Sequence, residues 1–188
     1  MNLQSIFLLT LFAILAVIFF TVIARVKAQG GELFGRPTIN IYLQLIGKFC
    51  LILPAGFLLL SAFGIDLVRV EVPLYMQWIA LFIFFESILF LTISLWHLGR
   101  YTKMGLPKSD GLRLKTGGIY RLSRNPMYLG LILMAIASVI YVPHPVNIIS
   151  ALAGIVIHHR IILAEEKFLS EKFGKEYRNY RAHTRRYL

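Results

Sequence analysis

The sequence of 188 residues is poor in charge, since only 15% of its residues are Asp, Glu, Lys or Arg, whereas 57% are hydrophobic. A water-soluble domain carries about 25% charged and about 45–50% apolar residues. Its single cysteine, Cys50, excludes a disulfide within the chain and is expected to be a small core residue. Glycine-rich phosphate loops, a GxSxG turn and zinc-type Cys/His spacings are also missing, so no metal is expected and any cofactor site must be built from helix ends and loops.

The sequence instead contains five long apolar runs. A helix needs about 20 apolar residues to cross the hydrocarbon core of a bilayer. The first run is too long for a signal peptide and has no Lys or Arg before it, so it is expected to stay as a membrane anchor. The fourth is short for a full crossing, and the two prolines after it predict a tight helical hairpin. The runs are Leu3–Ala24, Ile39–Phe63, Val72–Trp96, Tyr128–Val142 and Val146–Leu163.

The distribution of Lys and Arg predicts how these runs are oriented. The formal net charge is +11, and most of the cations fall in the segments after the first, third and fifth runs. Cationic segments stay cytoplasmic, so five spans with the N-terminus outside and the C-terminus in the cytoplasm bring all three to one side. The sequence therefore predicts an all-α integral membrane protein with a cytoplasmic active face, at the inner membrane of a bacterium or the endoplasmic reticulum of a eukaryote. Attraction to anionic lipid accounts for the charge, and nucleic-acid binding is not expected.

Two ionisable residues lie inside the apolar runs, Lys48 in the second and Glu86 in the third. A charge at that depth costs about 2.5–3.5 kcal/mol on insertion scales, so a partner is expected. Counting from the cytoplasmic ends places both residues at a similar depth. The favoured interpretation is an ion pair between them, and the alternative is a polar lining for a substrate cavity.

Two polar clusters near the cytoplasmic ends of the last spans are candidates for chemistry. Asn125-Pro126 fits an N-cap followed by proline at the first helical position, which points free N–H groups toward the cytoplasmic side. Glu165-Glu166 is unusual in a segment otherwise rich in cations. After it, aromatic residues including Tyr177 and Tyr180 recur at helical spacing and predict an amphipathic helix resting on the membrane interface. His158 and His159 are neighbours and point in different directions, so they do not form a metal site.

These clusters resemble a known family. Residues 118–130, GIYRLSRNPMYLG, resemble the GxYxxxRHPxYxG signature of isoprenylcysteine carboxyl methyltransferases and their phospholipid methyltransferase relatives. Glu165-Glu166 and the segment FGKEYRNY at 173–180 resemble the EExxL and FGxxYxxY motifs of the same family. The resemblance covers roughly residues 97–182. It implies two parts in the chain, three N-terminal membrane helices in 1–98 and a methyltransferase region in 99–188, made of a loop, a helical hairpin and the amphipathic tail.

The resemblance also implies S-adenosylmethionine as methyl donor and a lipophilic acceptor, either an isoprenylcysteine-like carboxylate or a lipid. Arg124, Glu165 and Glu166 then take the catalytic positions, and Asn125 stands where the family commonly has His, which leaves hydrogen bonding and removes any role of an imidazole. If the acceptor is an amine, Glu166 is the candidate base. The positions implied for donor binding are Leu112, Arg113, Leu114, Lys115, Tyr120, Asn125, Pro126, Met127, Tyr128 and Glu165.

Other classes of function stay open on the sequence alone. One is a non-enzymatic membrane module, or a small-molecule carrier that uses Lys48 and Glu86. Another is an oxidoreductase similar to the sterol reductases, which would bind a nicotinamide cofactor. The sequence does not distinguish the possible acceptors or the oligomeric state.

Overall fold

The computed structural model describes residues 2–28, 37, 39–65, 67, 71–98 and 114–188. Within these ranges the chain forms five α-helices and one short 3₁₀ helix, and no strand. The elements are α1 (Leu3–Ala28), α2 (Ile41–Ala62), α3 (Leu74–Leu98), η2 (Gly118–Arg121), α4 (Pro126–Tyr141) and α5 (Pro145–His183).

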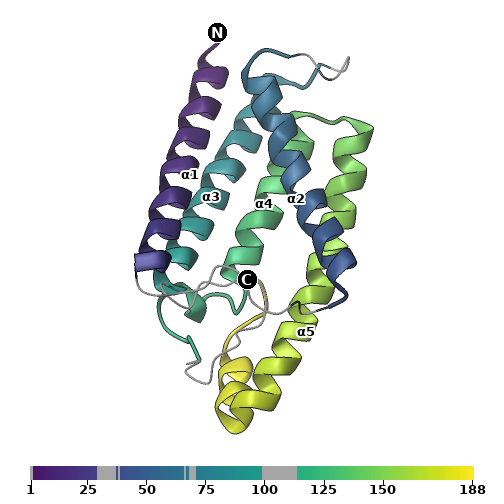
Figure 1. The fold of residues 1–188 in the computed structure, drawn as a ribbon. Helices are drawn as coiled ribbons and strands as arrows, with labels where there is room; N and C mark the ends of the chain where they lie inside the picture. Colours follow the sequence, from purple (N-terminus) through teal and green to yellow (C-terminus); the bar gives the residue numbers. More distant parts are fainter. Residues whose placement is uncertain (1, 29–36, 38, 66, 68–70, 99–113) are drawn as a thin grey trace.

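The helices stand side by side in an up-and-down bundle (Figure 1). α3 packs along α4, α2 packs along α5, and α1 contacts both α2 and α3. The start of α1, the end of α2, the start of α3 and the α4–α5 hairpin lie at one end of the bundle. α5 extends past the other end, and the chain then turns back so that the C-terminus lies near the start of α4. The last turn of α1, which carries Arg25 and Lys27, and the cationic end of α5 lie toward that other end as well.

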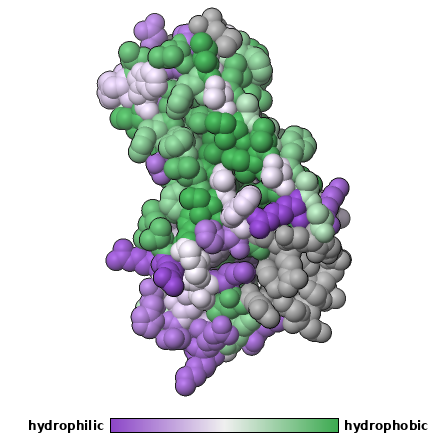
Figure 2. Space-filling model, turned by 90° about the vertical axis from the view of Figure 1, so that its left-hand side faces the viewer, coloured by the Kyte–Doolittle hydropathy of each residue, from purple (hydrophilic) through white to green (hydrophobic). Residues whose placement is uncertain are grey.

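Four of the described helices, α1, α2, α3 and α5, are long and apolar enough to cross a membrane, and α4 is a shorter apolar helix of 16 residues. Large hydrophobic side chains cover their outer faces; Val17, Phe20 and Ile52, for example, are 65–69% exposed. Figure 2 shows that apolar residues dominate the upper part of one face and hydrophilic residues the lower part. Apolar surface of this extent, spread over helices of membrane-spanning length, is typical of a protein that contacts lipid. The predicted all-α integral membrane protein is thus confirmed.

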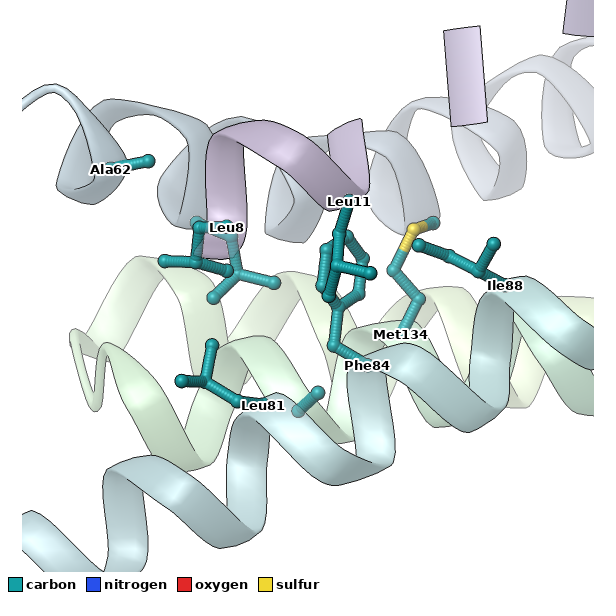
Figure 3. Close-up of a cluster of buried hydrophobic side chains, with 9 residues drawn as sticks. Leu8, Leu11, Ala62, Leu81, Phe84, Ile88 and Met134 are labelled. Atoms are coloured by element: carbon teal, nitrogen blue, oxygen red, sulfur yellow. The ribbon is translucent and has the colours of Figure 1, made fainter. Parts of the chain in front are cut away.

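The core lies where α1, α2, α3 and α4 meet (Figure 3). Leu8 of α1 and Phe84 of α3 are fully buried, and Met134 of α4 packs in the same cluster. α4 comes very close to α3 at Gly130, where an added Cβ would lie 2.9 Å from the Ser87 carbonyl oxygen and 3.1 Å from the Leu91 backbone nitrogen. Small residues at helix contacts let backbones approach in this way in membrane proteins.

Pro54 interrupts the hydrogen bonding of α2, and neighbouring helices compensate for it. Proline has no N–H to offer the carbonyl four residues earlier, which is that of Cys50. The Ser150 hydroxyl on α5 donates to that carbonyl at 3.2 Å, and the Ser138 hydroxyl on α4 donates to the Pro54 carbonyl at 2.6 Å. Asn147 donates to the Ser138 hydroxyl at 2.9 Å. This buried polar network joins α2, α4 and α5 inside the apolar bundle.

The expected ion pair between Lys48 and Glu86 is absent from the described part of the chain. The interpretation was wrong because depth alone does not make two helices neighbours. α3 packs on α4 and α1, whereas α2 packs on α5, α4 and α1. Lys48 lies on the α5 side of the bundle, near His158. Glu86 faces the other side and lines a groove described below.

α5 runs for 39 residues and contains one break, at Gly174, where φ is +51° and ψ is −113°. An L side chain rarely adopts a positive φ, so glycine permits the bend that follows the FG motif. The bend corrects the expectation of an aromatic stripe on the membrane interface. Tyr177 is 1% exposed, and the Tyr180 hydroxyl donates to the Tyr120 carbonyl at 2.6 Å. Both side chains therefore pack inward, against the region that carries the family motif.

Candidate functional site

The segment between η2 and α4 carries the first residues of the candidate site. Pro126 opens α4, where its fixed φ suits the first helical position, and Asn125 occupies the N-cap position as predicted. The Asn125 side chain makes no capping hydrogen bond. It donates instead to Glu166 Oε1 and to the Arg186 carbonyl, both at 3.3 Å. The Asn125 amide thus links the start of α4 to α5 and to the C-terminal segment.

Glu166 is the centre of this polar cluster and is 6% exposed. Arg124 Nη2 lies 3.0 Å from its Oε1, and Arg186 Nη2 lies 2.9 Å from its Oε2. Each guanidinium adds a bond from its Nε, at 3.1 Å for Arg124 and 3.2 Å for Arg186. Hydrogen bonding to Glu166 raises the pKa of Arg186. Two cations on one buried carboxylate hold it in the ionised form and occupy both of its oxygens.

Arg124 also holds the backbone of the C-terminal segment. Its side chain is 7% exposed, and its Nη1 donates to the carbonyl oxygens of Arg181, at 3.3 Å, and of Thr184. Its backbone N–H donates to the Arg185 carbonyl at 2.9 Å. Almost every N–H group of Arg124 is therefore engaged within the protein, which leaves little for a bound substrate.

Tyr120, Tyr128 and Glu165 form a second cluster beside the first. The Tyr128 hydroxyl donates to Glu165 Oε1 at 2.8 Å. Tyr120 lies on η2 and is 8% exposed, and its carbonyl accepts from Tyr180. Burial raises the pKa of the Tyr120 phenol, and the nearby Tyr180 and Glu165 side chains raise it further. The phenol stays neutral, so this cluster offers two aromatic rings and one carboxylate.

His158 was not predicted as part of this site. It precedes Glu165 by seven residues, which is two turns of α5, so both lie on the same face of the helix. Its ring centroid lies 5.8 Å from that of Tyr128, and its Nδ1 lies 2.8 Å from the Gly154 carbonyl oxygen. The spacing of seven from Glu165 was the signal in the sequence. This spacing was missed because the adjacent residues His158 and His159 were tested only as possible metal ligands.

The remaining predicted donor-binding residues have varied positions. Leu112 and Arg113 lie outside the described residues. Leu114 is half-buried and Lys115 is exposed in the segment before η2. Pro126 is buried and Met127 half-buried in the first turn of α4.

The sequence predicted Arg186 only as one more cytoplasmic cation and placed Tyr180 on the membrane surface. Their roles were missed because the long-range contacts of the C-terminal segment leave no local pattern.

These features define a class of protein: an all-helical membrane protein in which the motif residues of a helical hairpin meet at the polar end of the bundle. Arg124 contacts Glu166, which lies 42 residues further along the chain, and Tyr128 contacts Glu165. Residues 68–176 match the phospholipid methyltransferase family. The match spans more than half of the chain, and the protein belongs to this family, as the resemblance predicted. No curated protein matches the sequence.

Proposed function

We propose that this membrane protein transfers a methyl group from S-adenosylmethionine to a lipophilic acceptor. The observation that carries the proposal is the hydrogen bond of 2.8 Å between the Tyr128 phenol and Glu165, next to the buried Tyr120. It places a carboxylate and two aromatic rings together at the polar end of the hairpin, in a chain of a methyltransferase family.

The residues of this cluster fit the chemistry of the proposed donor. Glu165 offers a carboxylate for the donor's ammonium group, and the rings of Tyr120 and Tyr128 offer flat apolar faces for its adenosine. Lys115 and the free N–H groups at the start of α4 suit its carboxylate. Leu112, Arg113 and Leu114 belong to the proposed site by resemblance, and Asn125, Pro126 and Met127 form the turn that positions Tyr128.

When bound, S-adenosylmethionine supplies an electrophilic methyl group, whose carbon bonds to an acceptor lone pair while the carbon–sulfur electron pair returns to sulfur. The protein's part is to align the two reactants and to exclude water. A carboxylate acceptor needs no base, whereas a protonated amine must first lose a proton. Glu166 was the candidate base, but both of its oxygens already accept hydrogen bonds from two guanidinium groups. These hydrogen bonds make Glu166 a weaker base.

We therefore assign Arg124 and Glu166 a positioning role and Glu165 a donor-contacting role. The Arg124–Glu166–Arg186 cluster holds the C-terminal segment against the start of α4, and Tyr180 holds the same segment against η2. That arrangement keeps Tyr120 and Tyr128 beside Glu165. The described cations around the site, among them Lys115, Arg121 and Arg181, support a cytoplasmic location for it.

The test is equilibrium binding of S-adenosylmethionine and of its demethylated product to the purified protein in detergent. Glu165→Gln removes the charge and Tyr128→Phe removes the hydroxyl, and each is expected to weaken binding by about 10- to 100-fold, the usual range for a lost hydrogen bond to a charged group. Glu171→Gln is the matched control, since Glu171 is 66% exposed on the same helix. A folded wild-type protein without affinity for either compound would refute the proposal.

A further inference from the structure

Lys48 on α2 and Glu86 on α3 carry opposite charges within the apolar part of the bundle. Both side chains are half-buried. Within the described ranges of the chain, neither of them forms a salt bridge or a hydrogen bond. A charge in the hydrocarbon region costs about 2.5–3.5 kcal/mol on insertion scales, and such residues commonly pair with one another. An opposite charge from another molecule would therefore stabilise each of them.

The contacts of α5 and α4 show how deep Lys48 lies in the bundle. Its neighbour on α2 is Gly47, where an added Cβ would lie 3.4 Å from Cε1 of His158 on α5. The His158 ring centroid in turn lies 5.8 Å from that of Tyr128, in the first turn of α4. Lys48 is therefore close to the level of the first turn of α4.

Glu86 lies at nearly the same level on the opposite side. Its neighbour on α3 is Ser87, whose carbonyl oxygen would lie 2.9 Å from a Cβ added to Gly130 of α4. Gly130 follows Tyr128 by two residues, so the levels of Lys48 and Glu86 differ by about one helical turn, or about 5 Å. The flexible four-carbon stem of lysine spans a difference of this size.

Glu86 lines an apolar groove on the outer face of α3. The groove has a volume of about 360 Å³, and its lining includes Leu89, Phe90 and Ile93 of the same helix. These residues follow helical spacing and form one stripe. Leu89 and Ile93 are 37% and 39% exposed, so the groove opens toward the surroundings of the bundle. It can therefore accept side chains from another membrane helix.

α2 carries a ridge of apolar side chains beside Lys48. Leu45, Phe49 and Ile52 are 53%, 64% and 65% exposed, and their spacing of four and three residues places them on one face of the helix. Lys48 is three residues from Leu45 and four from Ile52, so it borders this ridge. A ridge of this kind packs into the groove of a second helix. Ridge and groove thus match in shape class and carry opposite charges.

We propose that Lys48 pairs with Glu86 of a second copy of this chain, with the α2 ridge of one protomer packed into the α3 groove of the next. Two different faces meet in this contact, so each protomer uses its ridge for one neighbour and its groove for another. Contacts of this heterologous kind build rings or open chains. Membrane helices associate through close packing and polar contacts between side chains. The pairing involves neither a methyl donor nor an acceptor, so it is independent of the proposed function.

The experiment measures energy transfer between full-length copies that carry donor and acceptor fluorophores on N-terminal tags, in phosphatidylcholine vesicles. Wild-type copies are expected to associate. Lys48→Glu and Glu86→Lys each place like charges across the contact, and each should lower the association constant by about tenfold or more. A mixture of these two variants should regain the wild-type association, because the first supplies two acidic residues and the second two basic ones.

A second pair of variants tests the packing without changing any charge. Phe49→Ala removes the middle of the α2 ridge and should weaken association. Phe20→Ala is the matched control, since Phe20 is 69% exposed on α1, and it should leave association unchanged. Circular dichroism and thermal unfolding show whether each variant is folded.

Three results would overturn the pairing. One is the absence of energy transfer between wild-type copies over the whole range of protein-to-lipid ratios. Another is a single charge reversal that associates as tightly as the wild type. The third is a mixture of Lys48→Glu with Glu86→Lys that stays as weak as either variant alone. Should the charge reversals fold poorly, the alanine variants decide, and equal association of Phe49→Ala and Phe20→Ala overturns the pairing.

Discussion

Replacing Glu166 with glutamine keeps the size of the side chain and removes its charge. In the wild type this carboxylate is 6% exposed and accepts bonds from Arg124, Asn125 and Arg186. The substitution leaves the Arg124 guanidinium, whose side chain is 7% exposed, as a buried cation without a counterion. It also places an amide NH₂ group where one of the two arginines now donates. The C-terminal segment should therefore be held less firmly.

The size of the effect follows from the burial of the three partners. Breaking a buried ion pair by removing one partner costs about 3–5 kcal/mol. The Arg186 side chain is 29% exposed and can recover hydration, and the glutamine oxygen still accepts a bond, so we expect about 3 kcal/mol. For a chain of this size about 3 kcal/mol corresponds to a fall in melting temperature of roughly 6–12 °C.

Thermal unfolding in detergent, followed by the fluorescence of Trp78 and Trp96, measures this fall. Glu171→Gln, at the exposed i,i+4 pair with Lys167, should shift the melting temperature by less than about 1 °C because such surface pairs contribute little. Combining Glu166→Gln with Arg124→Met should cost less than the sum of the two single changes, since the residues contact each other. An unchanged melting temperature together with lost methyl transfer would show that Glu166 acts in catalysis, and the positioning role would be refuted.

Two further changes test how the scaffold is built. Gly174→Ala should lower the free energy of unfolding by about 1–2 kcal/mol, because φ is +51° at this position. The control is Gly56→Ala, which should be neutral or stabilising, because an added Cβ also meets no neighbour there and the residue lies within regular helix. Thermal unfolding compares the two variants, and equal effects would show that the positive φ of Gly174 is not the cause. Asn147→Ala should lower the free energy of unfolding by about 1–3 kcal/mol, because it leaves the hydrogen-bond network around Pro54 incomplete. The control Ile149→Ala, on the exposed side of α5, should have little effect. If Asn147→Ala also leaves stability unchanged, the network does not support α2.

The membrane fold could be predicted from the sequence because it depends on local quantities. The length of an apolar run sets where a helix can cross, and the positions of Lys and Arg set its direction. The predicted second run, Ile39–Phe63, differs from α2 by one or two residues at each end. The α4–α5 hairpin likewise followed from the prolines at 143 and 145. What periodicity did not give was the neighbour of each helix, and for that reason Lys48 and Glu86 were paired although α2 and α3 face different partners.

The candidate site was predictable only in part, for a similar reason. Motif positions placed Tyr128 and Glu165 in one region, and their hydrogen bond bridges 37 residues of sequence. The role of Arg186 depends on the break at Gly174 and on the return of the chain toward α4. No local pattern encodes such a return. The burial of Tyr177 was missed because an aromatic stripe at helical spacing looks the same whether it faces a membrane or a protein surface.

The C-terminal segment is held mainly through its backbone, and this determines which mutations it tolerates. Arg124 and Ser123 bond the main-chain oxygens of residues 181 and 184–186, and of the side chains in that stretch only Arg186 enters the cluster. Register therefore matters more than residue identity. Substitutions at 181 and 185 should be silent, whereas inserting or deleting a single residue between Gly174 and Arg186 would shift every carbonyl out of place and release the segment as a whole.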